Sequence, residues 1–521
     1  MQFENAKELK RMDTNLIMRK SFMMLIAGLF CAMTTMLFTG CSSDNDDNPT
    51  TDPTKESVDY TVIFYGQGGE NLDMQIMDNI SQFFLADASS YKKVNVVGQY
   101  KCSTAENLME NSLSEDYASK FGSKTYRFVC NSKVEYQEAW MDDVNIYGAD
   151  NCDCTNPDSL ANFINWAARV CPAKNYVLIF SDHGGGYMPH DDLPYQPATR
   201  GLIYDDGNDK SHFTVTSLTS ALRAAGIRPQ VIYMDACLMN TVEYQFELKD
   251  LCDYYVASTF CMPGVGGDYT TLVNSLATTD IEKALTALVN SDIARWGDEE
   301  FNGSDIMRIF NDQTVTRTAK LNDFGIALKA FSDKLVAAYR SGDQTVVNAI
   351  DECTKVAFKV ERERPTYDLI DYVNAICDAL PAVFPATLRS QVNDAFQACV
   401  VKAGCSETLA NKELSVELSV LIGFDNTYVY NGQALGEQGE VTDAIKYFYA
   451  DGRSLLLKPA YPDFKVENTW GSTFGATYKQ LAFDKAVGWS RWIETNKQMP
   501  CQNSPLEWSV DFFYDVMNNI Q

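Results

Sequence analysis

The segments Tyr-Val-Leu-Ile-Phe-Ser-Asp-His-Gly-Gly-Gly at 176–186 and Val-Ile-Tyr-Met-Asp-Ala-Cys at 231–237 decide the fold. Each begins with a continuous apolar, β-branched run, which is typical of a parallel strand that is buried on both faces. The first run ends at His183 and the second at Cys237. Because ligands and catalytic groups collect beyond the carboxyl ends of such strands, we expect these two side chains to share one sheet edge.

The sequence around these two segments alternates between strand and helix patterns. Further strands are predicted over 60–65, 94–100 and 125–130. Helices are predicted over 72–86 and 216–225, and another helix is predicted to begin at the capping sequence Asn156-Pro157-Asp158-Ser159. This order predicts an α/β sandwich with a mainly parallel sheet and helices on both of its faces. Beyond residue 280 the pattern is mainly helical, with helices predicted over 282–294, 315–338, 368–379 and 388–401 and an edge strand within 414–422.

The first 41 residues are predicted to be a targeting segment rather than part of the folded domain. From Met18 a basic start leads into an apolar run that ends at Thr39-Gly40-Cys41, as in a secretory signal peptide. The end resembles a bacterial lipobox, which implies lipidation of Cys41; an uncleaved membrane anchor is the alternative. Residues 42–57 are polar and aperiodic, as expected of a disordered tether. We therefore expect a lipid-anchored outer-membrane protein of the bacterial envelope, exposed at the cell surface.

Length and charge restrict the function. The chain has 521 residues and a formal net charge of −27, which argues against nucleic acid as a partner because phosphate recognition requires basic surface. An acidic field suits a cationic substrate, although solubility alone also explains the charge. The length without the tether predicts a core over 58–300 and a mainly helical region over 301–521.

The chain contains fifteen cysteines, which is compatible with an exported protein. Cys31 lies in the signal, Cys41 is the predicted lipid site, and an even number remains besides Cys237, so disulfides are possible without a readable connectivity. Cys152-Asp-Cys154 has neither a nearby histidine nor a second close cysteine pair. We therefore expect no metal site there.

His183 and Cys237 together predict nucleophilic catalysis. The chain has only three histidines, and an imidazole can take the thiol proton and later protonate a leaving amine. Gly184 allows close approach of a substrate, and the backbone N–H groups of Gly184 and Cys237 are the candidate oxyanion donors. The alternatives are an inert buried cysteine and a histidine that only completes a turn.

These motifs resemble the clostripain family of cysteine peptidases. The resemblance rests on the His183-Gly-Gly-Gly and Asp235-Ala-Cys237 segments, and covers residues 58–275 well; Pro263-Gly-Val-Gly266 and Asp368-Leu-Ile-Asp371 also match. It implies a caspase-like αβα sandwich and a cysteine endopeptidase with a His183/Cys237 dyad.

The same resemblance implies a substrate pocket for a basic residue. Asp235 lies two residues before Cys237 on the same strand, so both are expected on one face. In the family the matching aspartate lines the pocket, which implies cleavage of proteins or peptides after Arg or Lys. By position, Ser258 is a substrate contact or pocket wall and Asp268 a second pocket acid. Alternatively, Asp235 caps the helix that follows Cys237.

The connection between the two catalytic segments contains Arg200 and Lys210 in a polar, proline-bearing context. Because members of the family mature by cleavage between the histidine and the cysteine, the resemblance predicts self-cleavage after Arg200 or Lys210. His190 and His212 of this connection are either surface residues or metal ligands. Some family members respond to calcium, for which Asp205, Asp206 and Asp209 are candidates beside a simple solvated loop; otherwise no cofactor is expected.

Two other functions remain compatible with the sequence. The same fold could cleave after another residue, such as Asn, or the chain could be a catalytically silent envelope lipoprotein that binds a partner. Retention of both His183 and Cys237 argues against the silent protein, and Asp235 argues against a neutral specificity.

Overall fold

The computed structural model describes residues 57–130, 141–142, 152–187, 201–208, 211–303, 307–308, 310–356, 366–411, 419–421, 426–430, 433–434, 465–468 and 478–495. They belong to one unit, Glu56–Gln521. The expected signal peptide with Cys41, the tether up to residue 56, and His190, Arg200, Asp209 and Lys210 lie outside this description. Within the described ranges, no helix is both long enough and apolar enough to cross a membrane.

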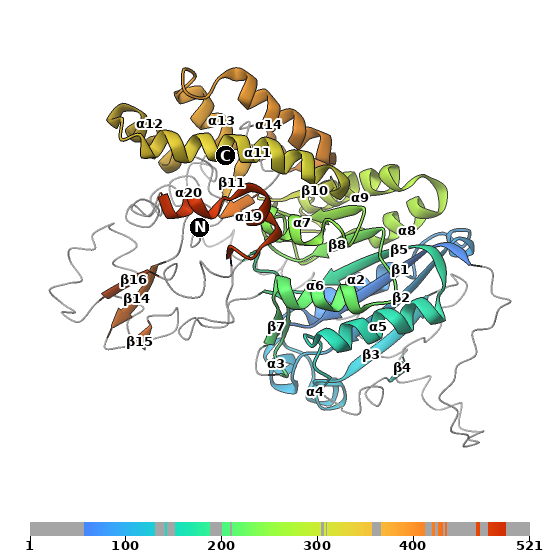
Figure 1. The fold of residues 1–521 in the computed structure, drawn as a ribbon. Helices are drawn as coiled ribbons and strands as arrows, with labels where there is room; N and C mark the ends of the chain where they lie inside the picture. The colour runs from blue at the N-terminus through green and yellow to red at the C-terminus, as the bar shows by residue number, and fades with distance from the viewer. Residues whose placement is uncertain are drawn as a thin grey trace, which may run out of the picture. The chain divides into compact units, whose positions relative to one another are not determined.

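The two predicted strands β5 (Ala173–Ser181) and β8 (Val231–Asp235) lie side by side and parallel at the centre of a nine-stranded sheet (Figure 1). The strand order is β12-β10-β9-β8-β5-β1-β2-β3-β4. The other strands are β1 (Val58–Gln67), β2 (Val94–Lys101), β3 (Thr125–Cys130), β4 (Met141–Asp142), β9 (Tyr254–Ala257), β10 (Asp312–Arg317) and β12 (Val400–Cys405). The run from β9 to β2 is parallel, and the strands outside it pair antiparallel.

Helices cover both faces of this sheet. One core contains α5 (Pro157–Val170), α6 (Val215–Ala224) and α7 (Val242–Leu248), and the other contains α2 (Asp73–Gln82), α8 (Tyr269–Thr278) and α9 (Ile281–Gly297). Alternate residues of β5 enter opposite cores: Leu178 and Phe180 belong to the first, Val177 and Ile179 to the second. Burial on both faces explains why β5 is apolar from Val177 to Phe180. The predicted αβα sandwich is confirmed.

Local sequence accounts for the helix starts. Asn156 caps α5 by accepting a hydrogen bond from the Asp158 N–H (2.8 Å), and Pro157 occupies the first turn, as predicted. Thr214 starts α6 in a reciprocal capping box with Ser217. The helix predicted over 72–86 is shorter and spans Asp73–Gln82.

The helix predicted over 315–338 is wrong at its beginning. Residues Asp312–Arg317 form β10, a short 3-10 helix follows at Thr318–Lys320, and α11 spans Leu321–Arg340. The β-branched run Thr314-Val315-Thr316 favours a strand once β9 and β12 supply backbone partners on both sides. Because β10 and β12 extend the main sheet, the expected boundary at residue 300 does not coincide with its edge.

The remaining C-terminal elements are mainly helices, several of which gather at one end of the unit (Figure 1). They are α12 (Gln344–Val356), α13 (Leu369–Ala379), α14 (Ala386–Cys399), α15 (Glu407–Asn411), α19 (Ala482–Val487) and α20 (Ser490–Thr495). A strand does form within 414–422, as β13 (Ser419–Leu421), but it pairs with β11 (Thr366–Asp368) in a separate two-stranded sheet. The strands β14 (Asn426–Tyr430), β15 (Gln433–Ala434) and β16 (Lys465–Asn468) form a third sheet.

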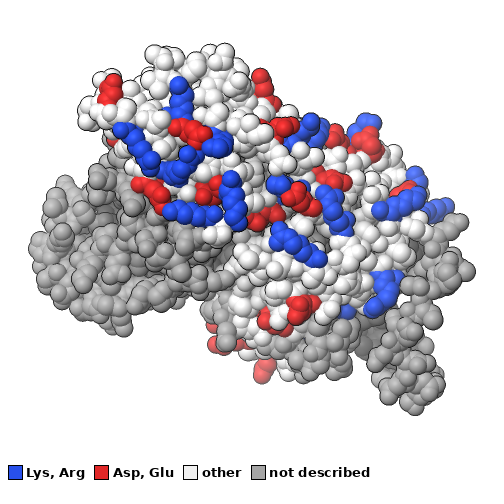
Figure 2. Space-filling view, in the orientation of Figure 1, with Lys and Arg blue, Asp and Glu red and all other residues white. Residues whose placement is uncertain are grey.

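Smaller elements complete the described chain. A 3-10 helix (Ser90–Lys92), α3 (Ala105–Glu110) and α4 (Glu115–Phe121) flank β2, and β6 (Leu202–Asp205) pairs with β7 (Ser211–Phe213) in a hairpin. On the face drawn in Figure 2, basic and acidic side chains lie interspersed. Most exposed pairs of opposite charge contribute little to stability.

Candidate active site

The carboxyl ends of β5 and β8 meet, as the sequence predicts. Ser181 of β5 is in register with Asp235 of β8, so His183 and Cys237 each follow their strand by two residues. A Cβ atom on Gly184 would lie only 2.3 Å from the Cys237 carbonyl oxygen and 2.9 Å from its backbone nitrogen. The backbone directly after His183 therefore packs on the backbone of Cys237, and only glycine fits there.

His183 is positioned by a residue that sequence reasoning missed. Its Nε2 atom lies 2.8 Å from Oδ1 of Asn71, in the turn between β1 and α2. With Nε2 donating this hydrogen bond, Nδ1 carries the lone pair that can accept a proton. Gly69 in the same turn has φ +52°, and a Cβ there would lie 2.9 Å from Cδ2 of His183. The glycine-rich sequence after β1 is the signal that this turn approaches the histidine.

Cys237 is half-buried, and the Cys261 thiol lies beside its own. Interaction with the Cys261 thiol first, and burial of the sulfur second, raise the pKa of Cys237 well above its ordinary value, while the backbone of Met262 lowers it. At neutral pH Cys237 is therefore a thiol. A base would be needed to convert it to the reactive thiolate.

The chain turns sharply directly after the cysteine. Leu238 has φ +64°, a left-handed conformation that costs about 1–3 kcal/mol for a non-glycine residue and is found mainly at functional sites. The turn is held by hydrogen bonds from Leu238 N–H to the Phe260 carbonyl (3.0 Å) and from Asn240 N–H to the Ser258 carbonyl (2.9 Å). The segment 258–261 thus lies along the turn that carries the nucleophile.

Asp235 lies beneath this edge and is nearly buried (5% exposed). Its carboxylate accepts a short hydrogen bond from the Tyr269 hydroxyl and lies 3.4 Å from the Ser181 hydroxyl. Burial raises the pKa of Asp235 to about 6, against the lowering effect of these partners. The helix after Cys237 is α7, which is capped by Thr241 through the Tyr244 N–H (3.2 Å). The alternative that Asp235 caps this helix is therefore wrong.

Ser258 is buried (1% exposed), and its hydroxyl lies 2.9 Å from Oδ1 of Asp312 on β10. Asp312 also accepts from the backbone N–H groups of Thr259 (2.9 Å) and Phe260 (3.0 Å). Burial raises the pKa of Asp312 to about 6. Ser258 therefore anchors its own loop in this conformation and is not exposed to a substrate. Asp312 is a second positioning residue that sequence reasoning missed.

Asp268 begins α8 as its N-cap and accepts from the Thr271 N–H (2.9 Å). Its other oxygen accepts from the Ser291 hydroxyl (2.6 Å), and Arg295 lies 3.8 Å away. Although burial raises its pKa, the hydrogen bonds from Ser291 and Thr271 leave the pKa of Asp268 below its ordinary value. Both oxygens thus join α8 to α9, which is a structural role rather than that of a second pocket acid.

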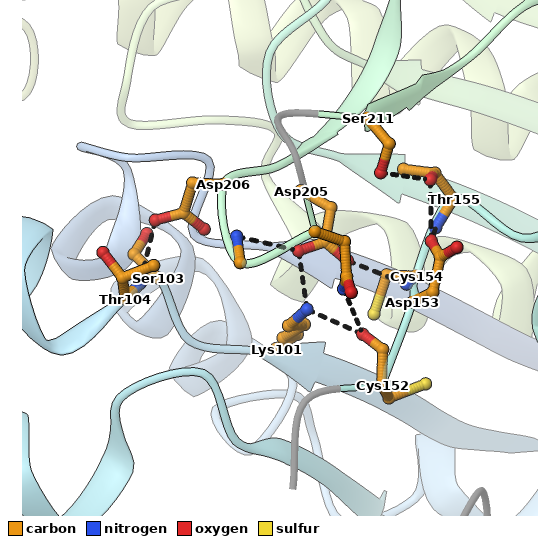
Figure 3. Close-up of polar contacts among 12 residues, drawn as sticks. Lys101, Ser103, Thr104, Cys152, Asp153, Cys154, Thr155, Asp205, Asp206 and Ser211 are labelled. Carbon is orange, nitrogen blue, oxygen red and sulfur yellow. Dashed lines mark hydrogen bonds and ion pairs between the residues drawn. The ribbon is translucent and has the colours of Figure 1, made fainter. Parts of the chain in front are cut away.

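The β6–β7 hairpin lies against the histidine segment. The Ile203 N–H donates to the His183 carbonyl (3.2 Å) and the Tyr204 N–H to Oδ2 of Asp182 (2.5 Å). Figure 3 shows the buried Lys101 ammonium between Oδ1 of Asp205 (2.6 Å) and the carbonyl of Cys152 (2.6 Å). This ion pair fastens the hairpin to β2.

The calcium candidates have protein partners in this hairpin. Asp205 pairs with Lys101, and Asp206 accepts from the Thr104 N–H (2.8 Å) and from Asn107 (2.6 Å). A lysine ammonium beside Asp205 makes a poor cation site. Within the described ranges, no three His, Cys, Asp or Glu side chains form a group that could hold a metal ion. His212 lies on β7 and is half-buried, and the described cysteines are thiols.

The model of the clostripain family matches residues 71–495. The chain belongs to the clostripain family. It is therefore a cysteine endopeptidase, consistent with the His183 and Cys237 segments at one sheet edge. None of the curated proteins compared with the chain matches it.

Solved structures share the fold. A secreted C11 cysteine protease from Bacteroides thetaiotaomicron, in complex with an irreversible peptide inhibitor, is 15% identical with a TM-score of 0.51; the match covers 83% of this chain and 99% of that one. An inactive zymogen C11 protease from Parabacteroides distasonis is 14% identical with a TM-score of 0.50, with the same coverage of 83% and 99%. At these identities the likeness concerns the fold alone.

Proposed function

We propose that this clostripain-family endopeptidase cleaves proteins and peptides after Arg or Lys, with Cys237 as nucleophile and His183 as general base and acid. The observation that carries the proposal is the packing of Gly184 on the Cys237 backbone, which brings the ends of β5 and β8 together. Asn71 then orients the imidazole through its 2.8 Å hydrogen bond to Nε2.

The chemistry follows from these positions. His183 removes the thiol proton as the Cys237 sulfur attacks the scissile carbonyl carbon, which places a negative charge on the carbonyl oxygen. The backbone N–H groups of Gly184 and Cys237 are the proposed donors to this oxyanion. The imidazolium returns its proton to the leaving amine, and a thioester to Cys237 remains. Water, deprotonated by His183, then hydrolyses the thioester and restores the thiol.

Specificity for a basic residue would come from Asp235. A Cβ on Gly266 would lie 2.9 Å from Oδ2 of Asp235, and the Gly267 N–H lies 3.5 Å from the same oxygen, so two residues without side chains lie directly against this carboxylate. A guanidinium could bind a carboxylate in bidentate fashion. The charges on the face in Figure 2 are mixed, and we assign the preference to the carboxylate of Asp235.

Self-cleavage between the dyad residues is proposed to occur after Arg200 rather than Lys210. Arg200 directly precedes Gly201 and the buried strand β6. Lys210 instead directly precedes Ser211, which pairs with Asp205 in the β6–β7 hairpin. Intact-mass analysis of wild type, Arg200→Ala, Lys210→Ala and Cys237→Ala tests this. Cleavage should vanish in Arg200→Ala and Cys237→Ala only; an unchanged cut in Arg200→Ala would refute the assignment.

Anchoring through a lipid on Cys41 remains part of the proposal. The lipobox-like end of the apolar segment supports it, and the Bacteroides neighbour is described as a secreted protease. Radiolabelled fatty acid should be incorporated by the wild-type chain expressed in a Bacteroides host and not by Cys41→Ser. Incorporation by both proteins, or by neither, would reject Cys41 as the lipid site.

A peptide panel tests the whole proposal. Purified protein is incubated with fluorogenic peptides that differ only in Arg, Lys or Asn before the reporter group, with Cys237→Ala as control. Cleavage of the Arg or Lys peptide by wild type alone is expected. Cleavage of the Asn peptide alone would support the alternative specificity, and no Cys237-dependent cleavage of any peptide would support a silent binding protein.

A further inference from the structure

We propose that Cys261 is a redox partner of the nucleophile: the two thiols form a reversible Cys237–Cys261 disulfide in the presence of small-molecule disulfides, which switches the peptidase off. The inference rests on the proposed role of Cys237, and it adds a modification site on the loop after β9. Sequence reasoning gave Cys261 no part.

The backbone register places the two cysteines opposite each other. The hydrogen bonds Leu238 N–H to Phe260 carbonyl (3.0 Å) and Asn240 N–H to Ser258 carbonyl (2.9 Å) are two residues apart on both segments and run antiparallel. The next pair in this register is Cys237 with Cys261. Both cysteines therefore lie next to the Leu238–Phe260 hydrogen bond, on facing segments. The proposed disulfide requires their Cα atoms to come within roughly 4.4–6.8 Å of each other.

The two side chains are neighbours. The Cys261 thiol lies beside Cys237 and is the largest cause of the raised pKa of its thiol. The loop is held from below by the buried Asp312, which binds the N–H groups of Thr259 and Phe260. Cys261 is thus presented to Cys237 by a fixed loop rather than by a flexible one.

Access distinguishes this pair from the other cysteines. Cys261 is exposed and Cys237 is half-buried, whereas Cys102, Cys154 and Cys252 are at most 2% exposed. A soluble disulfide can therefore reach Cys261 without unfolding of the core. Thiol–disulfide exchange requires this access as well as a thiolate.

The step balances as two exchanges. The Cys261 thiolate attacks a disulfide RSSR, forms a mixed disulfide with one RS group and releases the other as RSH after protonation. The Cys237 sulfur, deprotonated by His183, then attacks the Cys261 sulfur and displaces the second RSH. The protein loses two hydrogens and is oxidised, RSSR is reduced to two RSH, and the nucleophile is blocked until a thiol reductant reverses both exchanges.

Oxidised glutathione is the probe for the test. Wild type is incubated with it, quenched with acid, and examined by intact mass, by peptide mapping without reduction and by activity before and after dithiothreitol. We expect a protein two hydrogens lighter, a crosslinked Cys237–Cys261 peptide, and an activity loss of about tenfold or more that dithiothreitol reverses. Cys261→Ser should instead retain glutathione on Cys237. Cys405→Ser, which removes another partly exposed cysteine, should behave like wild type.

The readouts separate the possible failures. A stable glutathione adduct on wild-type Cys237 without a crosslink, or a crosslink of Cys261 to any other cysteine, would overturn the redox pairing. Formation of the crosslink in a protein that cleaves none of the Arg, Lys or Asn peptides would support the pairing and reject the proposed peptidase specificity instead. The mapping does not depend on activity, so the two ideas fail independently.

Discussion

Two pairs of cysteines in this molecule have similar chemistry and opposite surroundings. Cys152 and Cys154 are 2% and 1% exposed and lie beside the buried Lys101–Asp205 ion pair (Figure 3). Burial first, and a hydrogen bond from Cys152 second, raise the pKa of Cys154 well above its ordinary value. Cys237 also has a raised pKa and a neighbouring thiol, but it lies at the sheet edge where the strand before His183 also ends.

Under the proposed mechanism, a raised thiol pKa does not by itself make a cysteine inert. Cys237 then differs from Cys154 in its access and in the proposed base, His183, which follows the neighbouring parallel strand. The Cys152–Cys154 segment instead supplies backbone groups: the Cys152 carbonyl accepts from Lys101 and the Cys154 N–H donates to Asp205 (2.9 Å). The chemistry is proposed for Cys237 and Cys261, whereas the backbone of the Cys152–Cys154 segment holds the β6–β7 hairpin.

The largest expected effect separates the two pairs directly. Cys237→Ala should abolish peptide cleavage, a loss of roughly four orders of magnitude or more, while the free energy of unfolding changes little. Cys154→Ala should cost about 1–2 kcal/mol of stability through a small cavity and leave the activity of the folded enzyme intact. Cleavage rates and urea unfolding of both variants measure this. Equal loss of activity in the two would erase the distinction.

The second effect concerns the carboxylate of Asp235. Asp235→Asn should lower kcat/KM for the Arg peptide roughly 30- to 700-fold, because a guanidinium would lose its charged partner. This factor corresponds to a loss of about 2–4 kcal/mol of transition-state stabilisation. Since burial raises the pKa of Asp235 to about 6, the Arg preference of wild type should also decline as the pH falls through 6 and the carboxylate is protonated. The ratio of Arg to Asn peptide cleavage against pH measures it. A ratio unaffected by pH or by the substitution would contradict the assignment.

The third effect concerns the buried ion pair beside Cys152 and Cys154. Asp205→Asn leaves the buried Lys101 ammonium without its charged partner, which should cost about 3–5 kcal/mol of stability. The matched control is Asp59→Asn, because Asp59 pairs with Lys174 at an exposed site and should leave stability unchanged. Denaturant unfolding of both variants gives the comparison. Similar stabilities for the two would mean that burial of the Lys101 pair is not what holds the hairpin.

A further effect concerns Asp292, a buried carboxyl whose charge interacts with that of Asp235. Asp292 accepts from the Asp268 N–H (2.6 Å), and burial raises its pKa to about 8 from an ordinary value of 3.8. The native state therefore holds this proton more tightly than the unfolded chain does, so its contribution to stability is present below pH 4 and is lost as the pH rises toward 8. Asp292→Asn should flatten this decline in the unfolding free energy. A decline as steep as that of wild type would exclude Asp292 as its source.

The sequence was sufficient for the elements whose signals are local. Burial on both faces makes β5 and β8 continuous apolar runs, and Asn156 with Pro157 marks the start of α5. Strand β10 was missed because it buries polar residues, of which Asp312 and Gln313 form hydrogen bonds with partners distant in the sequence. No pattern along the chain reports such partners.

The residues of the candidate site also divide into those that the sequence predicts and those that only the structure reveals. His183 and Cys237 end recognisable strands, so their proximity was predictable. Asn71 and Cys261 reach the site from loops, and only the packed structure brings them there. Ser258 and Asp268 were chosen by position in the family motif, whereas their hydrogen bonds give them structural roles.

The most direct test of the central claim is covalent labelling by a peptide that ends in arginine and carries an electrophilic ketone at the position of the scissile bond. Peptide mapping of the treated wild-type enzyme should find the label on Cys237. Labelling should be much slower in His183→Ala and in Asp235→Asn. A label on Cys261 or another cysteine, or equal labelling rates in wild type and His183→Ala, would contradict the account.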